Sequence, residues 1–425
     1  MSIVLPKELA YTPSLPTIPA GTISKEIVLA PVNGATFQDG ALVQFDLNQA
    51  GYLDPKSLYI RYRATQTNAS GAVNVCKIPA YTFLQRSEVI IGSTMVESIN
   101  DYNVWCNLFA DLQLDPAQRY GNGAAWGLTN TSESLESQDS GVMANNGSID
   151  VAAPLPNLLS ACEKLVPLGM MGNVRLQLTF ERLASIFAYQ ASNYPTAISF
   201  SNVELCYTQI DFSGAVDSMV MGMGEKFYIK SQGIASMSNN QNVAFSGSVD
   251  LPFNMRLASV KSLFTTFAPV SGTNVLLAVN KKFDSIDISS RNGSMVYQVG
   301  GVQYPSREVS TLRNPTSVLV ELRKACGGLH STDYNSSISA AEFGILDSAP
   351  TTTAVRPAKF YFGANLETLS SNGILLSGVS TQSSPIMLRI STSTTTTLGY
   401  NITLFAMYDA LIEIEPATRN ASVKQ

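Results

Sequence analysis

The chain has 425 residues, enough for two or three domains of roughly 100–200 residues, and 45% of its residues are hydrophobic, so each domain can bury a sizeable core. Only 14% of the residues are charged and the net charge is −5, which excludes a general electrostatic attraction to nucleic acid. A surface of neutral polar groups is easily desolvated, so the composition fits large protein interfaces and, equally well, a secreted β protein.

Residues 1–22 are expected to form an extended arm. Pro6, Pro13, Pro16 and Pro19 exclude a long helix there. The few charges of the arm cancel, so it lacks the basic block of a segment that packages a genome. We identify no signal peptide and no apolar run of the about 18 residues that span a membrane. The arm either reaches a neighbouring molecule or is a disordered tail.

Alternation of apolar and polar residues recurs along the chain, as half-buried strands require. It is clearest at residues 58–63, 175–181, 386–390 and 412–414. Clusters of Gly, Pro, Asn and Ser between these segments serve as turns. The pattern predicts all-β sandwiches or barrels rather than βαβ units.

Two segments have helical spacing instead. The first runs from about Ser98 to Leu112, with its large apolar residues on one face. The second is marked by a capping residue at Asn314, Pro315 at the first helical position and Gly327 at its end. The polar stretches 121–150 and 327–353 are predicted to be long loops.

Three short segments recur in the same order about half a chain apart. They are Lys56-Ser57-Leu58-Tyr59 with Lys261-Ser262-Leu263-Phe264, residues 91–95 with residues 300–304, and Asn202-Val203-Glu204-Leu205 with Asn401-Ile402-Thr403-Leu404. The offsets are 205, 209 and 199 residues, and a predicted helix follows the second segment in each copy. The repetition indicates two copies of one β domain, joined near residues 213–224, where three glycines loosen the chain.

The side chains that usually carry chemistry are few and scattered. The cysteines are Cys76, Cys106, Cys162, Cys206 and Cys326. An odd, dispersed set argues against a disulfide framework and against a zinc site, so we expect buried free thiols. His330 is the sole histidine and lies in a polar stretch, where a solvated surface group is expected. Nucleophilic systems that need a histidine base would all depend on it.

Paired carboxylates could still support glycoside hydrolysis. The pairs Asp46 with Asp54 and Glu413 with Glu415 are indistinguishable from surface charges, and the second pair is predicted to share a solvent-facing side of one strand. Residues 219–224 lack the pattern of a dinucleotide-binding loop, which favours core packing or a flexible strap between domains.

Tyr59, Tyr62 and Tyr207 lie on predicted strands, where core or interface positions are favoured over a nucleic-acid platform. We therefore predict no catalytic, cofactor-binding or metal-binding residue, no cofactor, and a protein that is not an enzyme.

Several segments resemble the double jelly roll major capsid proteins, the lineage of adenovirus hexon, tailless membrane-containing phages, virophages and polinton-like viruses. Residues 300–305 resemble the segment before the helix of the second jelly roll. Residues 362–366 and 376–380 resemble the strand and loop that follow, and residues 407–414 resemble the closing strand.

The resemblance implies two consecutive eight-stranded jelly roll barrels, each with a short helix insertion. The expected divisions are an arm (1–22), a first jelly roll (23–214), a linker (215–224), a second jelly roll (225–417) and a tail (418–425). It also implies homotrimers that fill six-fold positions of an icosahedral capsid assembled inside the host cell. Neighbouring capsomers, penton and minor capsid proteins are the implied partners, with a membrane or a packaging protein inside and no sequence-specific contact with nucleic acid.

Three alternatives stay open. A secreted or surface β-sandwich that binds carbohydrate or acts as an adhesin would share the strands and the composition. A viral spike or penton protein is closer, but the duplication favours the hexon role. A glycosidase is opposed by the lack of a recognisable constellation of residues.

Overall fold

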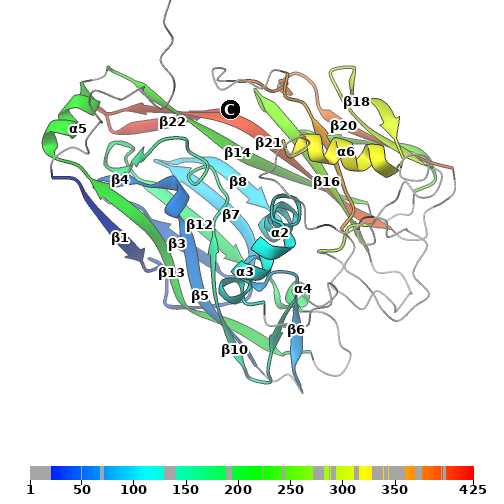
Figure 1. Cartoon of the computed structure of the whole chain (residues 1–425), viewed down its shortest axis with the longest axis horizontal. Helices are drawn as coiled ribbons and strands as arrows, with labels where there is room; N and C mark the ends of the chain where they lie inside the picture. The colour runs from blue at the N-terminus through cyan, green and yellow to red at the C-terminus, as the bar shows by residue number, and fades with distance from the viewer. Residues whose placement is uncertain are drawn as a thin grey trace, which may run out of the picture.

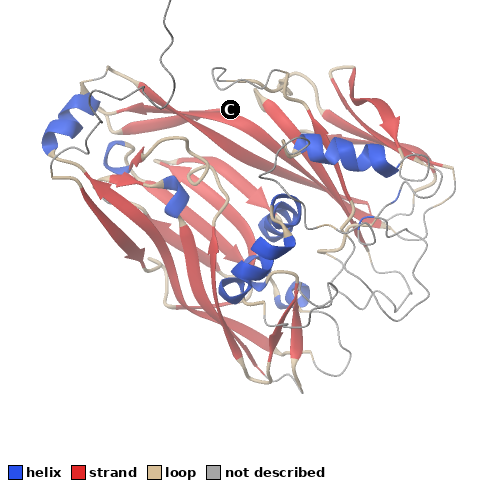
Figure 2. Ribbon diagram, in the orientation of Figure 1, coloured by secondary structure: helices blue, strands red, loops and turns tan. Residues whose placement is uncertain are grey.

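Strands dominate the computed structural model (Figures 1 and 2). It describes residues 21–48, 50–67, 71–128, 140–187, 194–222, 224–241, 245–270, 282–286, 288, 293–310, 315–327, 338, 343, 359–368, 376–393, 395 and 399–425. Most of the arm and His330 lie outside these residues, as does nearly all of the predicted loop 327–353.

The first half of the chain forms two main antiparallel sheets. Its strands are β1 (Ile23–Leu29), β2 (Thr36–Gln38), β3 (Leu42–Asp46), β4 (Tyr52–Leu53), β5 (Tyr59–Thr67), β6 (Val73–Cys76), β7 (Leu84–Ile91), β8 (Thr94–Asn100), β9 (Ser140–Met143), β10 (Ser148–Pro154), β11 (Val166–Pro167), β12 (Val174–Phe180) and β13 (Ala197–Asp211). One sheet has the order β10-β5-β13-β4-β11, with β1 and β2 also paired to β13. The other has the order β3-β12-β7-β8, and β6 pairs with β9 apart from both.

The second half repeats this arrangement. Its strands are β14 (Phe227–Gln241), β15 (Gly247–Phe253), β16 (Val260–Pro269), β17 (Ser294–Val299), β18 (Val302–Val309), β19 (Tyr361–Asn365), β20 (Ile386–Thr392), β21 (Tyr400–Glu415) and β22 (Asn420–Lys424). The sheets have the orders β14-β21-β16-β19, with β22 paired to β21, and β15-β20-β17-β18.

The two halves have the same strand connectivity. The order β1-β13-β5-β10 corresponds to β14-β21-β16-β19, and β3-β12-β7-β8 corresponds to β15-β20-β17-β18. In each half, eight strands in chain order are therefore divided between two sheets as 1-8-3-6 and 2-7-4-5, the connectivity of a jelly roll. The predicted pair of eight-stranded jelly rolls is confirmed.

The repeated sequence segments occupy equivalent places in the two sheets. Tyr59 of β5 lies opposite Cys206 of β13, and Phe264 of β16 lies opposite Phe405 of β21. These two pairs are related by the same offsets as the sequence repeats. For these two segments the similarity seen in the sequence is therefore a similarity of strands. The hairpin repeat is one residue out of register, because the pair Ile91–Thr94 corresponds to Val299–Val302, an offset of 208 rather than 209 residues.

The helices include the two that were predicted and others that were not. They are α1 (Pro79–Thr82), α2 (Tyr102–Gln113), α3 (Pro116–Trp126), α4 (Leu183–Ile186), α5 (Gly214–Met221) and α6 (Pro315–Ala325), with short 3-10 turns at Pro55–Ser57 and Leu168–Met170. The first predicted helix begins only at Tyr102, because Ser98 is paired within β8. The second is confirmed as α6, with Arg323 and Lys324 in its last turn, although Asn314 lies outside the described residues.

The predicted loop 121–150 was wrong over most of its described part, which contains the end of α3, β9 and the start of β10. Asp115 caps α3: its side chain accepts from the Gln118 N–H, and the Gln118 side chain accepts from the Asp115 N–H, with Pro116 following the cap. These local signals were legible in the sequence.

The segment between the two halves was predicted to be packed in the core or to form a flexible strap, but up to Met221 it does neither. Residues 214–221 form α5, none of which is buried, and Met219 and Met221 are 70% and 54% exposed. The run from Ala215 to Met221 contains no proline or glycine, which allows a helix. Among the described residues, no helix is long and apolar enough to cross a membrane.

Candidate functional site at the junction of the two jelly rolls

The jelly rolls meet where β8, the last strand of a sheet in the first, lies beside β14, the first strand of the second (Figure 1). Glu97 of β8 is 3% exposed. One carboxylate oxygen accepts from the Ile234 N–H of β14 at 2.9 Å, and the other accepts from the Leu158 N–H at 2.7 Å. A single side chain thus satisfies a donor on each side of the junction, including one that β14 cannot pair within its own sheet.

Burial dominates the electrostatics of Glu97. It raises the pKa of the carboxyl from 4.5 to about 7, while the two backbone N–H groups act in the opposite direction. The titratable groups around it are the side chains of Tyr102, Cys162 and Tyr408, and no ion pair to Glu97 is present within the described residues.

Further hydrogen bonds extend this contact along β14. The Glu163 N–H donates to the Lys230 carbonyl at 3.0 Å, and the Asn100 N–H donates to the Ser236 hydroxyl at 2.7 Å. The first jelly roll therefore covers the free edge of β14 over several residues, which protects it from pairing with other chains.

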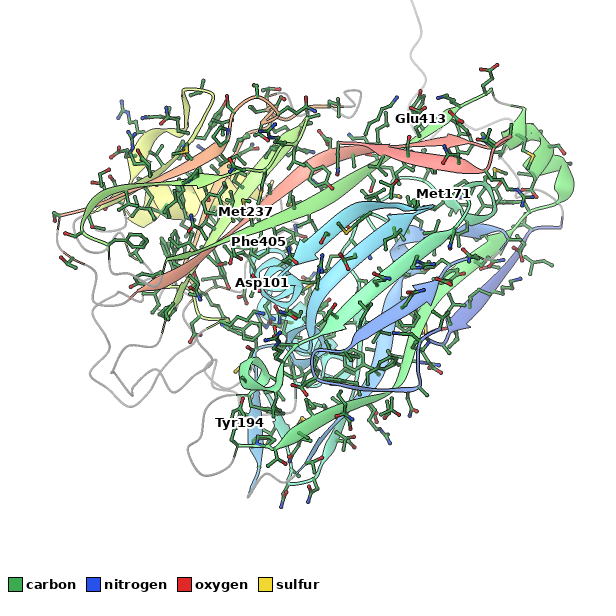
Figure 3. The ribbon with its side chains drawn as sticks, turned by 180° about the vertical axis from the view of Figure 1, so that it is seen from behind. Asp101, Met171, Tyr194, Met237, Phe405 and Glu413 are labelled. Atoms are coloured by element: carbon green, nitrogen blue, oxygen red, sulfur yellow. The ribbon has the colours of Figure 1, made fainter. Side chains whose placement is uncertain are left out.

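An aromatic cluster lies next to this edge. Trp105 of α2 is 1% exposed, and its ring centroid lies 5.9 Å from that of Phe264 and 5.5 Å from that of Phe405. Both phenylalanines belong to the second jelly roll, on the side of its sheet that faces α2. Figure 3 shows Phe405 and Asp101 close together where the two jelly rolls meet. The apolar core is continuous across the junction.

A buried charge cluster also joins the two halves. Asp111 of α2 is fully buried and accepts from the Tyr361 hydroxyl of β19 at 2.8 Å. It pairs with Arg119, and Lys359 of the second half lies 3.6 Å away. Burial opposes ionisation of Asp111, but Lys359, Arg119 and Lys77 hold its pKa well below the ordinary value. The charged form is therefore the one present at neutral pH.

A cavity of about 470 Å³ opens between the halves, lined by residues from both. Lys282 of the second half bridges Asp101, at 3.1 Å, and Glu181 of the first. Asn103 donates a second hydrogen bond to Glu181 at 2.7 Å. The acidic groups of the cavity are thus occupied in holding the two halves together, and no cluster of three or more potential metal ligands occurs in the described part of the chain.

The carboxylates singled out in the sequence do not form a catalytic pair. Asp46 pairs with Arg175 at 3.0 Å, and Asp54 caps the short turn at residues 55–57. The prediction that Glu413 and Glu415 share an ordinary solvent-facing side was wrong for Glu413, which is 6% exposed. It contacts Lys226 at 2.6 Å and Lys424 of β22, whose hydrogen bonds lower the pKa of Glu413 to about 2.

The aromatic and thiol side chains lie largely where they were predicted. Tyr62 and Tyr207 are in the core, whereas Tyr59 lies on the outer face of its sheet and donates to Glu26 at 2.7 Å. The cysteines are free thiols, and all are buried except Cys326, which is partly exposed.

Glu97 and Asp111 were missed in the sequence. Each is a single acidic residue inside an apolar segment, Val96 to Ile99 and Ala110 to Leu112, which is a signal of a buried, partnered carboxylate. Their partners Ile234 and Tyr361 lie 137 and 250 residues away, beyond what local patterns can identify.

No protein-family model matches the sequence, and no curated protein is similar to it. Several solved structures are similar over nearly the whole chain. VP54 of PBCV-1, fitted into a reconstruction of the virophage Sputnik, is 13% identical, with 97% of this chain and 98% of that chain covered and a TM-score of 0.64. The Faustovirus major capsid protein is 8% identical, with 96% and 92% covered and a TM-score of 0.65.

The mavirus major capsid protein is 10% identical, with 100% of this chain and 96% of that chain covered and a TM-score of 0.53. At these identities the likeness concerns the fold. The chain has the double jelly roll fold.

Proposed function

We propose that this chain is a major capsid protein that forms homotrimeric, pseudo-hexagonal capsomers of an icosahedral viral shell. The observation that carries the proposal is the duplication of one jelly roll within the chain, with equivalent residues in the same register. Two similar barrels in each chain allow three copies to surround an axis with six, so that a trimer fills a six-fold lattice position.

The surface composition supports this role. Charged residues make up 14% of the chain, and interfaces are depleted in Lys and Glu relative to other surfaces. Obligate interfaces commonly bury roughly 2,000–5,000 Å², which requires a surface that is easily desolvated. The arm, the two jelly rolls, the linker and the tail keep the boundaries given above as part of the proposal.

The expected partners are neighbouring capsomers, penton proteins and minor capsid proteins of the virion. The net charge of −5 and the neutral arm favour an inner face that meets a membrane or a separate packaging protein rather than nucleic acid. Purified capsomers should therefore show no tight binding to double-stranded DNA in an electrophoretic shift at physiological salt; tight binding would overturn this part of the proposal.

The native mass of the purified protein tests the central claim. Light scattering after gel filtration should give three times the 45.6 kDa of one chain, and the mass should persist on dilution. Electron microscopy should then show hexagonal particles. A stable, folded monomer would overturn the capsomer proposal and favour the β-sandwich binding module, which a glycan screen would address next.

A further inference from the structure

The contact between the jelly rolls has two counterparts, and no described strand covers either of them. Within one chain, β8 lies against β14, and Glu97 and Ile234 are both buried there. In the second jelly roll, β18 is the equivalent of β8, and in the first, β1 is the equivalent of β14. Each is the last strand at one end of its sheet order. Their residues are mostly exposed or half-buried, and Figure 1 shows them on opposite flanks of the molecule.

Strand register identifies the equivalent of Glu97. In the first hairpin, Ile91 pairs with Thr94 and Val89 pairs with Glu97. In the second hairpin, Val299 pairs with Val302 and Tyr297 pairs with Tyr304. The register of β8 shifts by one residue at Val96, so the residue pairs rather than the residues of β8 are counted from each turn. The third pair contains Glu97 in the first hairpin and Tyr304 in the second, which makes Tyr304 the counterpart of Glu97. It is half-buried at the edge of its sheet, where no strand of the described chain covers it.

The equivalent of Ile234 follows in the same way. Ile234 pairs with Met407 of β21, and Glu26 pairs with Thr208 of β13. Thr208 and Met407 differ by the 199 residues that relate the repeated segments of these two strands. Glu26 therefore stands on β1 where Ile234 stands on β14.

The backbone of Glu26 is directed toward the open edge of β1. The Thr208 N–H donates to the Ser57 hydroxyl at 2.8 Å, and the Thr208 carbonyl accepts from the Asp54 N–H at 3.0 Å, both on the side away from β1. In an antiparallel pair, two residues that lie directly opposite each other either both direct their N–H and carbonyl toward the other strand or both direct them away from it. The Glu26 N–H and carbonyl accordingly point outward, as the Ile234 N–H does.

We propose that β18 of one copy docks beside β1 of a second copy, with Tyr304 next to Glu26, as β8 docks beside β14 within the chain. The proposal rests on the trimer proposed above and identifies the surfaces that join its subunits. Exposed Ile23 and Val28, at 61% and 44%, supply apolar area along β1.

Such a contact is head-to-tail, because the two surfaces that meet are different. Head-to-tail contacts form closed rings when the rotation between copies closes and open chains when it does not. In the proposed trimer the contact within one chain is repeated between chains, so that six jelly rolls close a ring and assembly stops at three copies.

Cross-linking between engineered cysteines tests the pairing. The background protein carries Cys206→Ser, because Cys206 lies on β13 beside the strand to be labelled, and Cys326→Ser, because Cys326 is the partly exposed thiol. Three variants are then compared: Glu26→Cys, Tyr304→Cys, and the combination of both. Each is first checked for a trimeric mass by light scattering and then treated with a flexible bismaleimide, whose reach tolerates small differences between the two contacts.

The combined variant should give denatured bands of two and three chains and none larger, while each single variant stays at one chain. Cross-linking by Glu26→Cys alone would indicate a symmetric β1–β1 contact and overturn the proposal, and bands beyond three chains would overturn ring closure. A trimeric combined variant that does not cross-link would refute this pairing and leave the proposed function intact. A monomeric background protein would refute the proposed function itself.

Discussion

Glu97 is a carboxylate held between two backbone donors in a buried junction, and its protonation should control stability. Its pKa is 4.5 in the ordinary state and about 7 in the fold. Below pH 4.5 it is protonated in both states. As the pH rises toward 7, the unfolded chain releases the proton that the folded chain keeps, so the free energy of unfolding falls, by up to about 3 kcal/mol.

The measurement is the urea midpoint of the wild type and of Glu97→Gln between pH 5 and 8. The glutamine cannot ionise, so this part of the pH dependence should disappear, although its amide loses one accepted hydrogen bond. Glu163→Gln is the matched control, because the Glu163 side chain is 58% exposed, and it should keep the wild-type slope. Parallel curves for the wild type and Glu97→Gln would contradict the assignment.

Residue patterns in the sequence predicted the core well and the junction poorly. Tyr62 and Tyr207 were assigned to the core or an interface because they lie on predicted strands, and the pattern that predicts a strand is local. Glu413 was assigned to solvent by the same reasoning, but Lys226 and the strand carrying Lys424 cover it. A covering segment from elsewhere in the chain leaves no trace in a local pattern.

At the scale of elements, α2 should couple the folding of the two jelly rolls. Trp105→Ala removes a ring packed against Phe264 and Phe405 and should cost about 3–5 kcal/mol, as for other buried large-to-small changes. Since the lost contacts cross the junction, the two halves should no longer unfold together.

Trp126→Ala is the matched control. Trp126 is also buried, at 5% exposure, but its ring neighbour is Tyr81 of the same jelly roll. The chain has two tryptophans, so the fluorescence of Trp105→Ala reports the first jelly roll alone and far-ultraviolet circular dichroism reports both. The two signals should give different midpoints in Trp105→Ala and coincident ones in Trp126→Ala. Coincidence in both would show that the junction does not depend on α2.

Helices were predicted where their signals are local. Pro315 and the basic last turn identified α6 correctly, and the capping residues of α3 were equally available but lay in a stretch read as polar loop. The start of α2 was misplaced because the apolar periodicity runs on from β8 without a break. Neighbouring elements that share one buried face cannot be separated by periodicity alone.

At the scale of the whole molecule, the duplication was legible because strands in equivalent positions retain similar residues. The repeat of Lys56 to Tyr59 as Lys261 to Phe264 survives in the register of the two sheets. Chain order and register together then indicate which surfaces meet within the chain and which stay open. No local pattern could show that the open edges of β1 and β18 are the counterparts of the covered edges of β14 and β8. That relation depends on how the two halves of the chain are placed relative to each other.

Glu26→Pro should therefore separate the subunits without unfolding them. Proline removes an N–H that points to the open edge of β1, so no bond to β13 is lost, and proline is tolerated on such edges. The wild-type trimer should melt at a temperature that rises with protein concentration, because dissociation accompanies unfolding. The variant should have the mass of one chain and a melting temperature independent of concentration. Glu26→Ala, which keeps the N–H at the same position and loses only the side chain that accepts from Tyr59, should stay concentration-dependent. A Glu26→Pro protein that remains a dilution-resistant trimer would show that β1 does not join the subunits.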